Sequence, residues 1–322
     1  MNQLENPDRS QRPPASRAEW ESRREEALAG AQTIMGALPS AAADGPPPMS
    51  VVEEVDCGSY RRLRVEYEVD AGPPTPAYLL IPQGATPLTP RPAVLCLHPT
   101  DVAVGPDVVV GISDKPNRSY ASELAEQGFA VLAPAYPLMG GHDVDWAGLG
   151  YASATMKAIW DNIRGLDLLD SLPYVRGDQY GAIGHSLGGH NSVYTAAFEP
   201  RLGAVVTSCG LDSFEDYKGG DLSSWASRFY MPRLAGLTAA QVPFDFHDLV
   251  GALAPRPCLI SAPLRDDNFI WQSVDRVAAA ARQVYDLWGR GDDLVVQHPD
   301  CKHDFPEDVR RQAYDLLGRV LR

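Results

Sequence analysis

A single serine lies among closely spaced glycines in the segment AIGHSLGGHN, residues 182–191. The pattern is G-x-S-x-G, with the serine at position 186, and it follows the apolar run YGAIGH. This spacing is typical of a sharp turn from a strand into a helix, with the serine hydroxyl exposed at its tip. Gly184 and Gly188 let such a turn close without side-chain clashes. We therefore predict that Ser186 is a nucleophile.

A serine hydroxyl is a weak nucleophile near neutral pH, so it needs a base, and the base needs an orienting acid. Asp266 follows the apolar run CLISAP (258–263), and His303 follows the run LVVQH (294–298). The carboxyl ends of parallel strands meet at one edge of a sheet, so loops that follow several strands can converge there. The chain order Ser, Asp, His favours a catalytic triad of Ser186, Asp266 and His303.

Other residues compete for two of these roles. Asp267 adjoins Asp266, but we favour Asp266 because the next residues must turn away into the aromatic stretch NFIW. Asp212, after the run AVVTSC, is a further candidate for the acid. His298 competes with His303, but it lies at a strand end rather than on the loop.

Ester chemistry also needs two backbone N–H groups that face the developing negative charge. Leu187, the residue after the nucleophile, is expected to supply one. The loop after the run AVLCLH reads His98-Pro99-Thr100, and a proline has no N–H to offer. Thr100 is therefore the predicted second donor, and we expect His98 to hold the loop by packing and hydrogen bonding.

The segment between Leu211 and Pro257 is long, aromatic and irregular, which is typical of a lid or binding loop and equally of a packed insertion. Residues 213–247 are the candidate lid insertion. Aromatic side chains there and on nearby loops are either pocket walls or core. The candidates for a substrate pocket are Trp146, Trp225, Phe229, Tyr230, Phe269 and Trp271.

One cluster has residue types that bind metals. The segment GGHDVDW (140–146) holds His142, Asp143 and Asp145, which we interpret as a solvated loop rather than a metal site. We expect no metal and no cofactor.

The elements that must position these residues alternate in type. Six short apolar runs, at 93–98, 130–136, 180–185, 204–209, 258–263 and 294–298, are typical of strands buried on both faces. Helical patterns over 119–128, 153–172, 273–289 and 306–321 lie between or after them. Two extended runs at 60–69 and 76–82 suit an antiparallel pair. The fold class predicted is α/β, with a mostly parallel, doubly wound sheet flanked by helices.

The first 49 residues differ from the rest. Residues 1–15 are polar and proline-bearing, and Ser16 with Glu19 forms an S-x-x-E capping signature for a helix over about 17–37. Three prolines at 46–48 then make a stiff connector. We predict an N-terminal tail and helix over 1–49 that pack on a catalytic domain of residues 50–322.

The 322 residues are 44% hydrophobic and carry a net charge of −14. This acidity disfavours nucleic-acid binding. No apolar run approaches the roughly 18 residues of a membrane span, and the N-terminus shows no secretory signal, so we expect a cytoplasmic protein without a membrane partner. Five cysteines without C-x-x-C spacing are expected to be reduced. The sequence is compatible with a homo-oligomer.

The segments LCLHPT, GHSLGG, APLRDDNF and HPDCKHDFP resemble the α/β-hydrolase superfamily, and most closely bacterial dienelactone hydrolases and acetyl xylan esterases, over roughly residues 50–322. The resemblance implies the α/β-hydrolase fold, the triad Ser186, Asp266 and His303, and oxyanion donors at Leu187 and Thr100. True dienelactone hydrolases use a cysteine nucleophile, so Ser186 favours ordinary carboxylic esters. The implied substrate is a small or acetylated, carbohydrate-type ester, although the fold itself fixes no substrate.

Two other functions compete with a serine esterase. The first is a serine peptidase or amidase on the same scaffold, for which the sequence shows no propeller or large cap domain. The second is a non-catalytic binding protein that kept the fold, although such proteins commonly lose a triad member and none is missing here.

Overall fold

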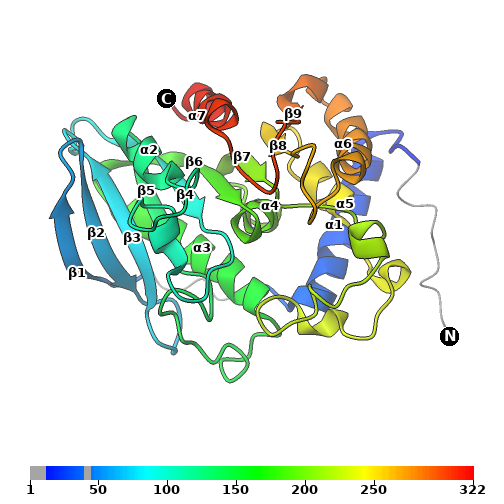
Figure 1. Ribbon diagram of the computed structural model, residues 1–322, viewed down its shortest axis with the longest axis horizontal. Coiled ribbons are helices and arrows are strands. Elements are labelled where there is room, and N and C mark those ends of the chain that lie inside the picture. Colours follow the sequence, from blue (N-terminus) through cyan, green and yellow to red (C-terminus); the bar gives the residue numbers. More distant parts are fainter. Residues whose placement is uncertain (1–11, 40–44) are drawn as a thin grey trace.

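The computed structural model describes residues 12–39 and 45–322, so most of the predicted polar tail lies outside the described residues. A nine-stranded sheet in the order β1-β2-β3-β5-β4-β6-β7-β8-β9 forms its centre (Figure 1). In this order, the neighbouring strands from β1 to β5 are antiparallel. The neighbouring strands from β5 through β4 to β9 are parallel. The strands are β1 (Met49–Asp56), β2 (Tyr60–Tyr67), β3 (Thr75–Pro82), β4 (Arg91–Leu97), β5 (Ala130–Pro134), β6 (Val175–His185), β7 (Leu202–Ser208), β8 (Cys258–Ser261) and β9 (Leu294–Gln297).

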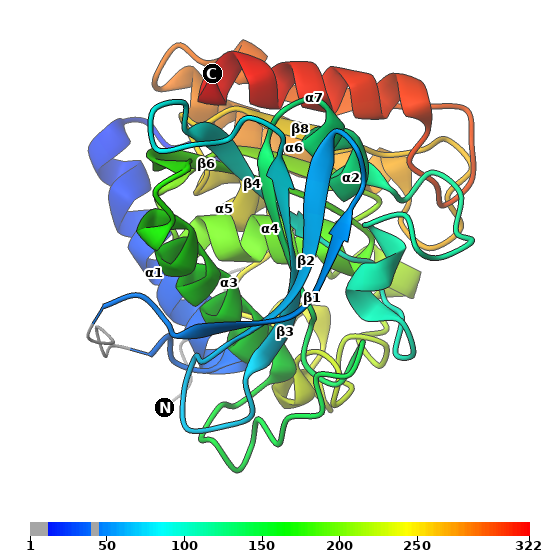
Figure 2. The same ribbon diagram turned by 90° about the vertical axis from the view of Figure 1, so that its left-hand side faces the viewer.

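Helices cover both faces of this sheet, as the predicted doubly wound class requires (Figures 1 and 2). Side chains of α2 and α7 pack with one set of strand residues, and those of α1, α3, α4, α5 and α6 pack with the other set. The alternation is clear in β4, where Leu95 faces the larger core and Val94 the smaller one. The helices are α1 (Arg17–Met35), α2 (Tyr120–Glu126), α3 (Ala154–Ser171), α4 (Leu187–Phe198), α5 (Phe246–Gly251), α6 (Trp271–Asp286) and α7 (Glu307–Leu321).

The predicted strands and helices are confirmed with small shifts of their ends. All six apolar runs are strands β4 to β9, and the two extended runs are the antiparallel pair β2 and β3. Strand β1 was not predicted. It lies at the edge of the sheet with six of its eight residues exposed, so its sequence has neither an apolar run nor a clear alternation.

The N-terminal helix α1 begins as the capping signature predicts. The Ser16 hydroxyl accepts a hydrogen bond from the Glu19 N–H at 3.2 Å, while the Glu19 carboxylate accepts from the Ala15 N–H at 2.9 Å. The helix packs on α5, because a Cβ atom added at Gly251 would lie 2.8 Å from the ring of Trp20. This contact attaches α1 to the body of the protein.

The long segment after β7 is compact rather than extended. It contains three 3₁₀ turns, at 217–219, 232–234 and 239–241, and the short helix α5, which the sequence did not predict. Its apolar side chains join the larger core, and those of Phe214, Trp225 and Phe246 are each at most 4% exposed. The packed-insertion interpretation therefore describes most of this segment. We call residues 209–257 the aromatic insertion.

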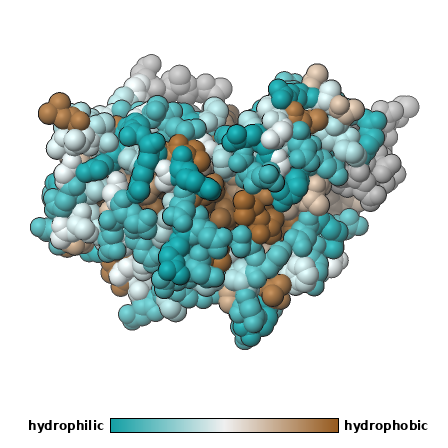
Figure 3. Space-filling model, turned by 90° about the horizontal axis from the view of Figure 1, so that it is seen from above, coloured by the Kyte–Doolittle hydropathy of each residue, from teal (hydrophilic) through white to brown (hydrophobic). Residues whose placement is uncertain are grey.

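One face of the molecule is mainly polar. Figure 3 shows polar residues over most of one face, with apolar residues gathered near its middle. Among the described helices, none combines the length and the hydropathy needed to cross a membrane.

Candidate active site

Ser186 occupies a strained turn between β6 and α4. Its backbone angles are φ 56° and ψ −119°, a conformation that side-chain-bearing residues rarely adopt. The chain passes so close to itself that a Cβ atom at Gly184 would lie 2.1 Å from the Gly188 carbonyl oxygen. One at Gly188 would lie 1.9 Å from the carbonyl oxygen of Leu97. The strand, the turn and the helix that the G-x-S-x-G motif predicts are thus all present.

Strand register brings the other predicted residues to the same edge. Gly184 pairs with Leu97 of β4, and His185 pairs with Ser208 of β7. Ser208 pairs with Ser261 of β8, which in turn pairs with Gln297 of β9. The loops after these strands therefore start side by side, and they carry Thr100, Ser186, Asp266 and His303.

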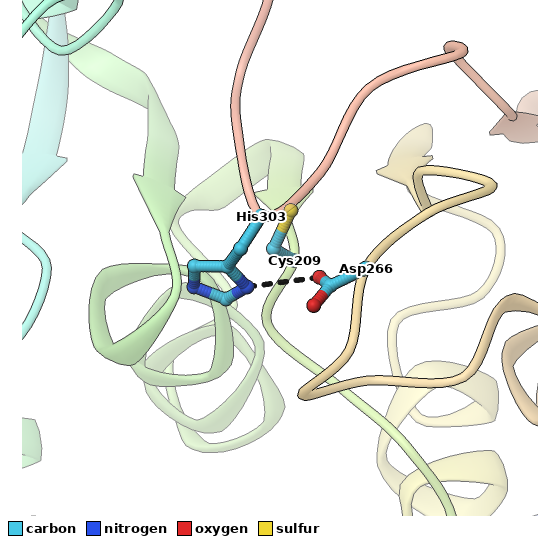
Figure 4. Close-up of side chains that lie close together, drawn as sticks. All are labelled: Cys209, Asp266 and His303. Carbon is cyan, nitrogen blue, oxygen red and sulfur yellow. Dashed lines mark hydrogen bonds and ion pairs between the residues drawn. The ribbon is translucent and has the colours of Figure 1, made fainter.

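The predicted base and acid form a hydrogen-bonded pair (Figure 4). His303 Nδ1 lies 2.9 Å from Asp266 Oδ2. The Asp266 side chain is fully buried, and its other oxygen accepts from the N–H groups of Asn268 at 2.9 Å and Phe269 at 3.3 Å. Burial raises the pKa of Asp266, but the hydrogen bond to His303 and those two backbone donors outweigh it, so the net pKa lies below its usual value. Asp266 is thus a charged acceptor.

The competing residues lie in other surroundings. Asp267 is exposed. His298 places Nε2 2.9 Å from Asp275 Oδ1 and Nδ1 2.8 Å from the Ala262 carbonyl oxygen, so its partners belong to other elements. Asp212 is buried and accepts from the Ile270 N–H at 3.1 Å. The structure thus gives Asp266, among the three candidate acids, the hydrogen bond to His303.

His185, which the sequence analysis did not single out, packs against His303. The two imidazole rings lie 4.8 Å apart, and His185 also stacks on Phe305 at 6.4 Å. Burial, together with the nearby charges of Arg118 and His303, holds the pKa of His185 well below its usual value. A neutral ring at this position packs against His303 without competing for its charge. The available sequence signal was the position of His185 directly before Ser186, at the end of strand β6.

The loop that carries His303 is held by a second set of polar contacts. Arg118 forms an ion pair with Asp304 and donates to the His303 carbonyl oxygen at 3.1 Å. Asn117 donates to the second oxygen of Asp304 at 2.7 Å. Burial raises the pKa of Asp304, but the hydrogen bonds from Arg118 and Asn117 bring the net pKa below its usual value. This arrangement, which no sequence motif marks, fixes the backbone at His303 and at the residue after it.

A thiol lies beside the acid and the base. The ligating atoms of Cys209, Asp266 and His303 all lie within 4.8 Å of one another (Figure 4). Burial raises the pKa of the Cys209 thiol well above its usual value, whereas a metal ligand must be a thiolate. The sulfur donates instead to the Asp304 carbonyl oxygen at 3.4 Å. Asp266 and His303 are therefore hydrogen-bonded to each other, and the Cys209 thiol beside them is hydrogen-bonded to the backbone.

The two predicted oxyanion donors lie at the start of α4 and on the loop after β4. Leu187 is the first residue of α4, so its N–H has no acceptor within the helix. Thr100 is exposed, and its hydroxyl lies 2.8 Å from the hydroxyl of Tyr230. His98 holds this loop as expected, because Nδ1 lies 2.7 Å from the Pro99 carbonyl oxygen and Nε2 accepts from the Tyr136 N–H at 2.9 Å. Burial lowers the pKa of His98 to about 4, so it is a neutral structural group.

The six aromatic pocket candidates divide into three groups. Trp146, Phe229 and Tyr230 are half-buried and pack against a small cluster that contains Leu187. Phe269 and Trp225 are buried, and the Phe269 ring lies 5.9 Å from that of His303. Trp271 packs instead on His298, with ring centres 5.3 Å apart. The first group therefore packs against the cluster that contains Leu187, the residue after Ser186. The second group lies beside His303, and Trp271 lies beside His298.

The solvated-loop interpretation of segment 140–146 is wrong for His142. Its side chain is buried and lies 4.0 Å from Asp161, which forms an ion pair with the buried Lys157. Asp143 and Asp145 are exposed, as expected. The reason for the difference is the fully buried Lys157–Asp161 pair on α3, against which the loop folds.

Comparisons with known proteins give a consistent result. No protein-family model matches the chain. The chain is 26% identical over 261 residues to YtaP of Bacillus subtilis (strain 168), a protein named as a hydrolase, and the match covers 76% of this chain and 83% of that protein. It is 22% identical over 265 residues to 4-O-methyl-glucuronoyl methylesterase 1 of Wolfiporia cocos (strain MD-104), covering 74% of this chain and 61% of that protein.

The structural comparison agrees with the sequence relatives. A glucuronoyl esterase from Solibacter usitatus matches with a TM-score of 0.78 at 18% identity, over 96% of this chain and 95% of that one. The mostly parallel sheet flanked by helices is common to both. The chain therefore has the α/β-hydrolase fold, and the proteins that it resembles in sequence and in structure are named as hydrolases and esterases.

Proposed function

We propose that the protein is a serine carboxylic-ester hydrolase that works through Ser186, His303 and Asp266. The single observation that carries the proposal is the strained Ser186 turn beside a loop on which His303 is hydrogen-bonded to the buried Asp266. A structural turn needs no such strain, and a surface histidine needs no buried carboxylate behind it.

In the first half of the reaction, His303 Nε2 takes the proton of the Ser186 hydroxyl as the oxygen attacks the ester carbon. Asp266 accepts the Nδ1 proton of His303, which fixes the tautomer and stabilises the imidazolium that forms. The carbonyl oxygen becomes an oxyanion that the N–H groups of Leu187 and Thr100 face. His303 then returns the proton to the departing alcohol, and the acyl group stays on Ser186.

The second half repeats these steps with water. His303 takes a proton from a water molecule that attacks the acyl carbon, and the carbon–oxygen bond to Ser186 breaks as His303 protonates the serine. The products are a carboxylic acid and the free enzyme. The reaction needs no metal or cofactor for its proton balance.

For the substrate we propose a carbohydrate-type ester. The relatives named as glucuronoyl esterases and methylesterases support this class, and the half-buried rings of Trp146, Phe229 and Tyr230 near Leu187 suit a sugar face. A panel should compare p-nitrophenyl acetate and butyrate, a glucuronic acid methyl ester and acetylated xylo-oligosaccharides. A preference for simple p-nitrophenyl esters over both sugar esters would contradict the substrate class alone.

The function itself is tested at Ser186. A fluorophosphonate should label the protein stoichiometrically at this residue, and Ser186→Ala should lower kcat for esters by about 10⁴–10⁶-fold while thermal unfolding is unchanged. Labelling of a different serine would refute the assignment. Turnover of p-nitroanilides at rates comparable to the esters would favour the peptidase or amidase alternative, and a wild-type protein without labelling or turnover would favour a binding protein.

A further inference from the structure

Beyond this mechanism, which it takes as given, the structure points to one more group at the oxyanion. We propose that the hydroxyl of Tyr230, supplied by the aromatic insertion, is a third hydrogen-bond donor to the oxyanion. Tyr230 would then be a catalytic residue, in addition to the backbone donors of Leu187 and Thr100.

The first observation is the position of the Tyr230 hydroxyl. It lies 2.8 Å from the hydroxyl of Thr100, and that hydroxyl is only three bonds from the Thr100 amide nitrogen. The Tyr230 ring also packs against the small cluster that contains Leu187. One side chain therefore contacts Thr100 directly and packs against the cluster that contains Leu187, although it is distant from both residues in the sequence.

The second observation is that this side chain is held in place. The Tyr230 ring meets His190 edge-on at 5.9 Å and Trp225 edge-on at 6.1 Å. Its backbone carbonyl oxygen accepts from the Thr155 N–H at 3.4 Å. A donor that is already positioned gives more stabilisation to a developing charge than one that must reorganise.

The third observation concerns protons. Either hydroxyl can be the donor in the Thr100–Tyr230 contact, so Thr100 can donate to the Tyr230 oxygen while Tyr230 directs its own proton to the substrate. Burial raises the pKa of Tyr230, with a smaller opposing effect of the hydrogen bond to Thr100, so the phenol keeps its proton. No proton is transferred in this role, and the phenol only donates a hydrogen bond.

The test is Tyr230→Phe, which removes one oxygen and leaves the ring packing intact. We expect kcat for esters to fall about 10- to 100-fold with KM changed less than about threefold, since loss of one oxyanion donor costs up to 10²–10³-fold. The affinity for a trifluoromethyl ketone, which forms an oxyanion on Ser186, should fall by a similar factor, while affinity for the product acid stays unchanged.

Tyr217→Phe is the matched control. Tyr217 also belongs to the aromatic insertion, but its hydroxyl lies 3.4 Å from Asn268 Oδ1 rather than at Thr100, so this variant should retain wild-type kcat. Thr100→Val keeps the backbone donor and removes the partner hydroxyl, and should lower kcat only severalfold. A Tyr230→Phe enzyme with unchanged kcat, or with only a raised KM, would overturn the proposal and make Tyr230 a pocket wall.

Failure of the underlying function has a different signature. A wild-type protein that neither hydrolyses esters nor is labelled at Ser186 would overturn both proposals together. A labelled, active wild type with an equally active Tyr230→Phe variant would overturn this one alone. Unfolding curves of the variants should coincide with that of the wild type, which separates the catalytic effect from a loss of structure.

Discussion

Two aspartates show how differently the two sides of the site are built. Asp266, behind the base, and Asp245, at the start of α5 in the aromatic insertion, each accept hydrogen bonds from two backbone N–H groups. Asp266 faces His303, and its pKa lies below its usual value, although burial alone would raise it. Around Asp245, burial is the main effect and Asp248 and Asp212 add repulsion, so its pKa rises to about 7.

The difference shows that backbone donors alone do not keep a buried carboxylate ionised. On the base side, the hydrogen bond to His303, a group that can carry a positive charge, helps to keep Asp266 ionised. The contacts there are polar and directional. On the insertion side, rings pack on rings, and the acid there lies among other acids. We therefore expect variants on the base side to change rates. In the insertion, we expect variants away from the Tyr230 hydroxyl to change stability and its dependence on pH.

The largest effect is expected for Asp266→Asn. An amide cannot hold the His303 tautomer, so kcat should fall by about 10⁴-fold, as it does in the best-studied triad. Asp267→Asn, at the exposed neighbour, should leave kcat nearly unchanged. Steady-state ester hydrolysis measures both, and the reverse ranking would show that the acid has been misassigned by one residue.

The next effect should appear as lost stability. Trp225 is 4% exposed and packs against rings that include Tyr217 at 5.4 Å. Trp225→Ala should therefore lower the free energy of unfolding by about 3–5 kcal/mol. The half-buried Trp271, changed to Ala, is the control and should cost less. If Trp225→Ala instead shifts acyl-length preference severalfold without a stability loss, the insertion acts as a mobile lid, and the contrast between the two sides fails.

A smaller effect is expected in the way the free energy of unfolding depends on pH. The pKa of Asp245 is raised by burial to about 7, so its contribution to stability is fully present below the unfolded value near 4 and is lost as the pH rises through 7. Urea unfolding should give a free energy about 2 kcal/mol lower at pH 8 than at pH 5. Asp245→Asn should flatten this slope. Asp266→Asn should not, because the lowered pKa of Asp266 confines its effect to pH values below about 4.

The smallest effect is expected on the loop of the base. Arg118→Ala removes the ion pair to Asp304 and the donor to the His303 carbonyl oxygen, so a misplaced base should lower kcat about 10-fold. Added guanidinium should restore part of the rate. Arg265→Ala is the control, since the Arg265 side chain contacts the same loop at the exposed Asp300 rather than at His303 or Asp304. Equal rates for both variants and the wild type would remove Arg118 from the positioning of the base.

Much of the fold could be predicted because the parallel strands are buried on both faces and therefore appear as continuous apolar runs. Strand β1 could not, because an exposed edge strand carries no such signal. The pairing of Asp266 with His303 followed from the order of strands and loops. The contacts of Arg118 with His303, 185 residues apart, and of Tyr230 with Thr100, 130 residues apart, follow only from the folded arrangement. His142 was misjudged because its burial depends on a helix elsewhere in the chain.

The edge strand β1 has a consequence for the behaviour of the protein at high concentration. An exposed edge leaves backbone groups that can pair with another chain and start aggregation. Here the edge carries Glu53, Glu54 and Asp56, and the pairing register shifts between Val51 and Glu53, which twists the strand. Two exposed valines, at 51 and 52, are thus followed at once by negative charges that would repel the same strand of a second molecule.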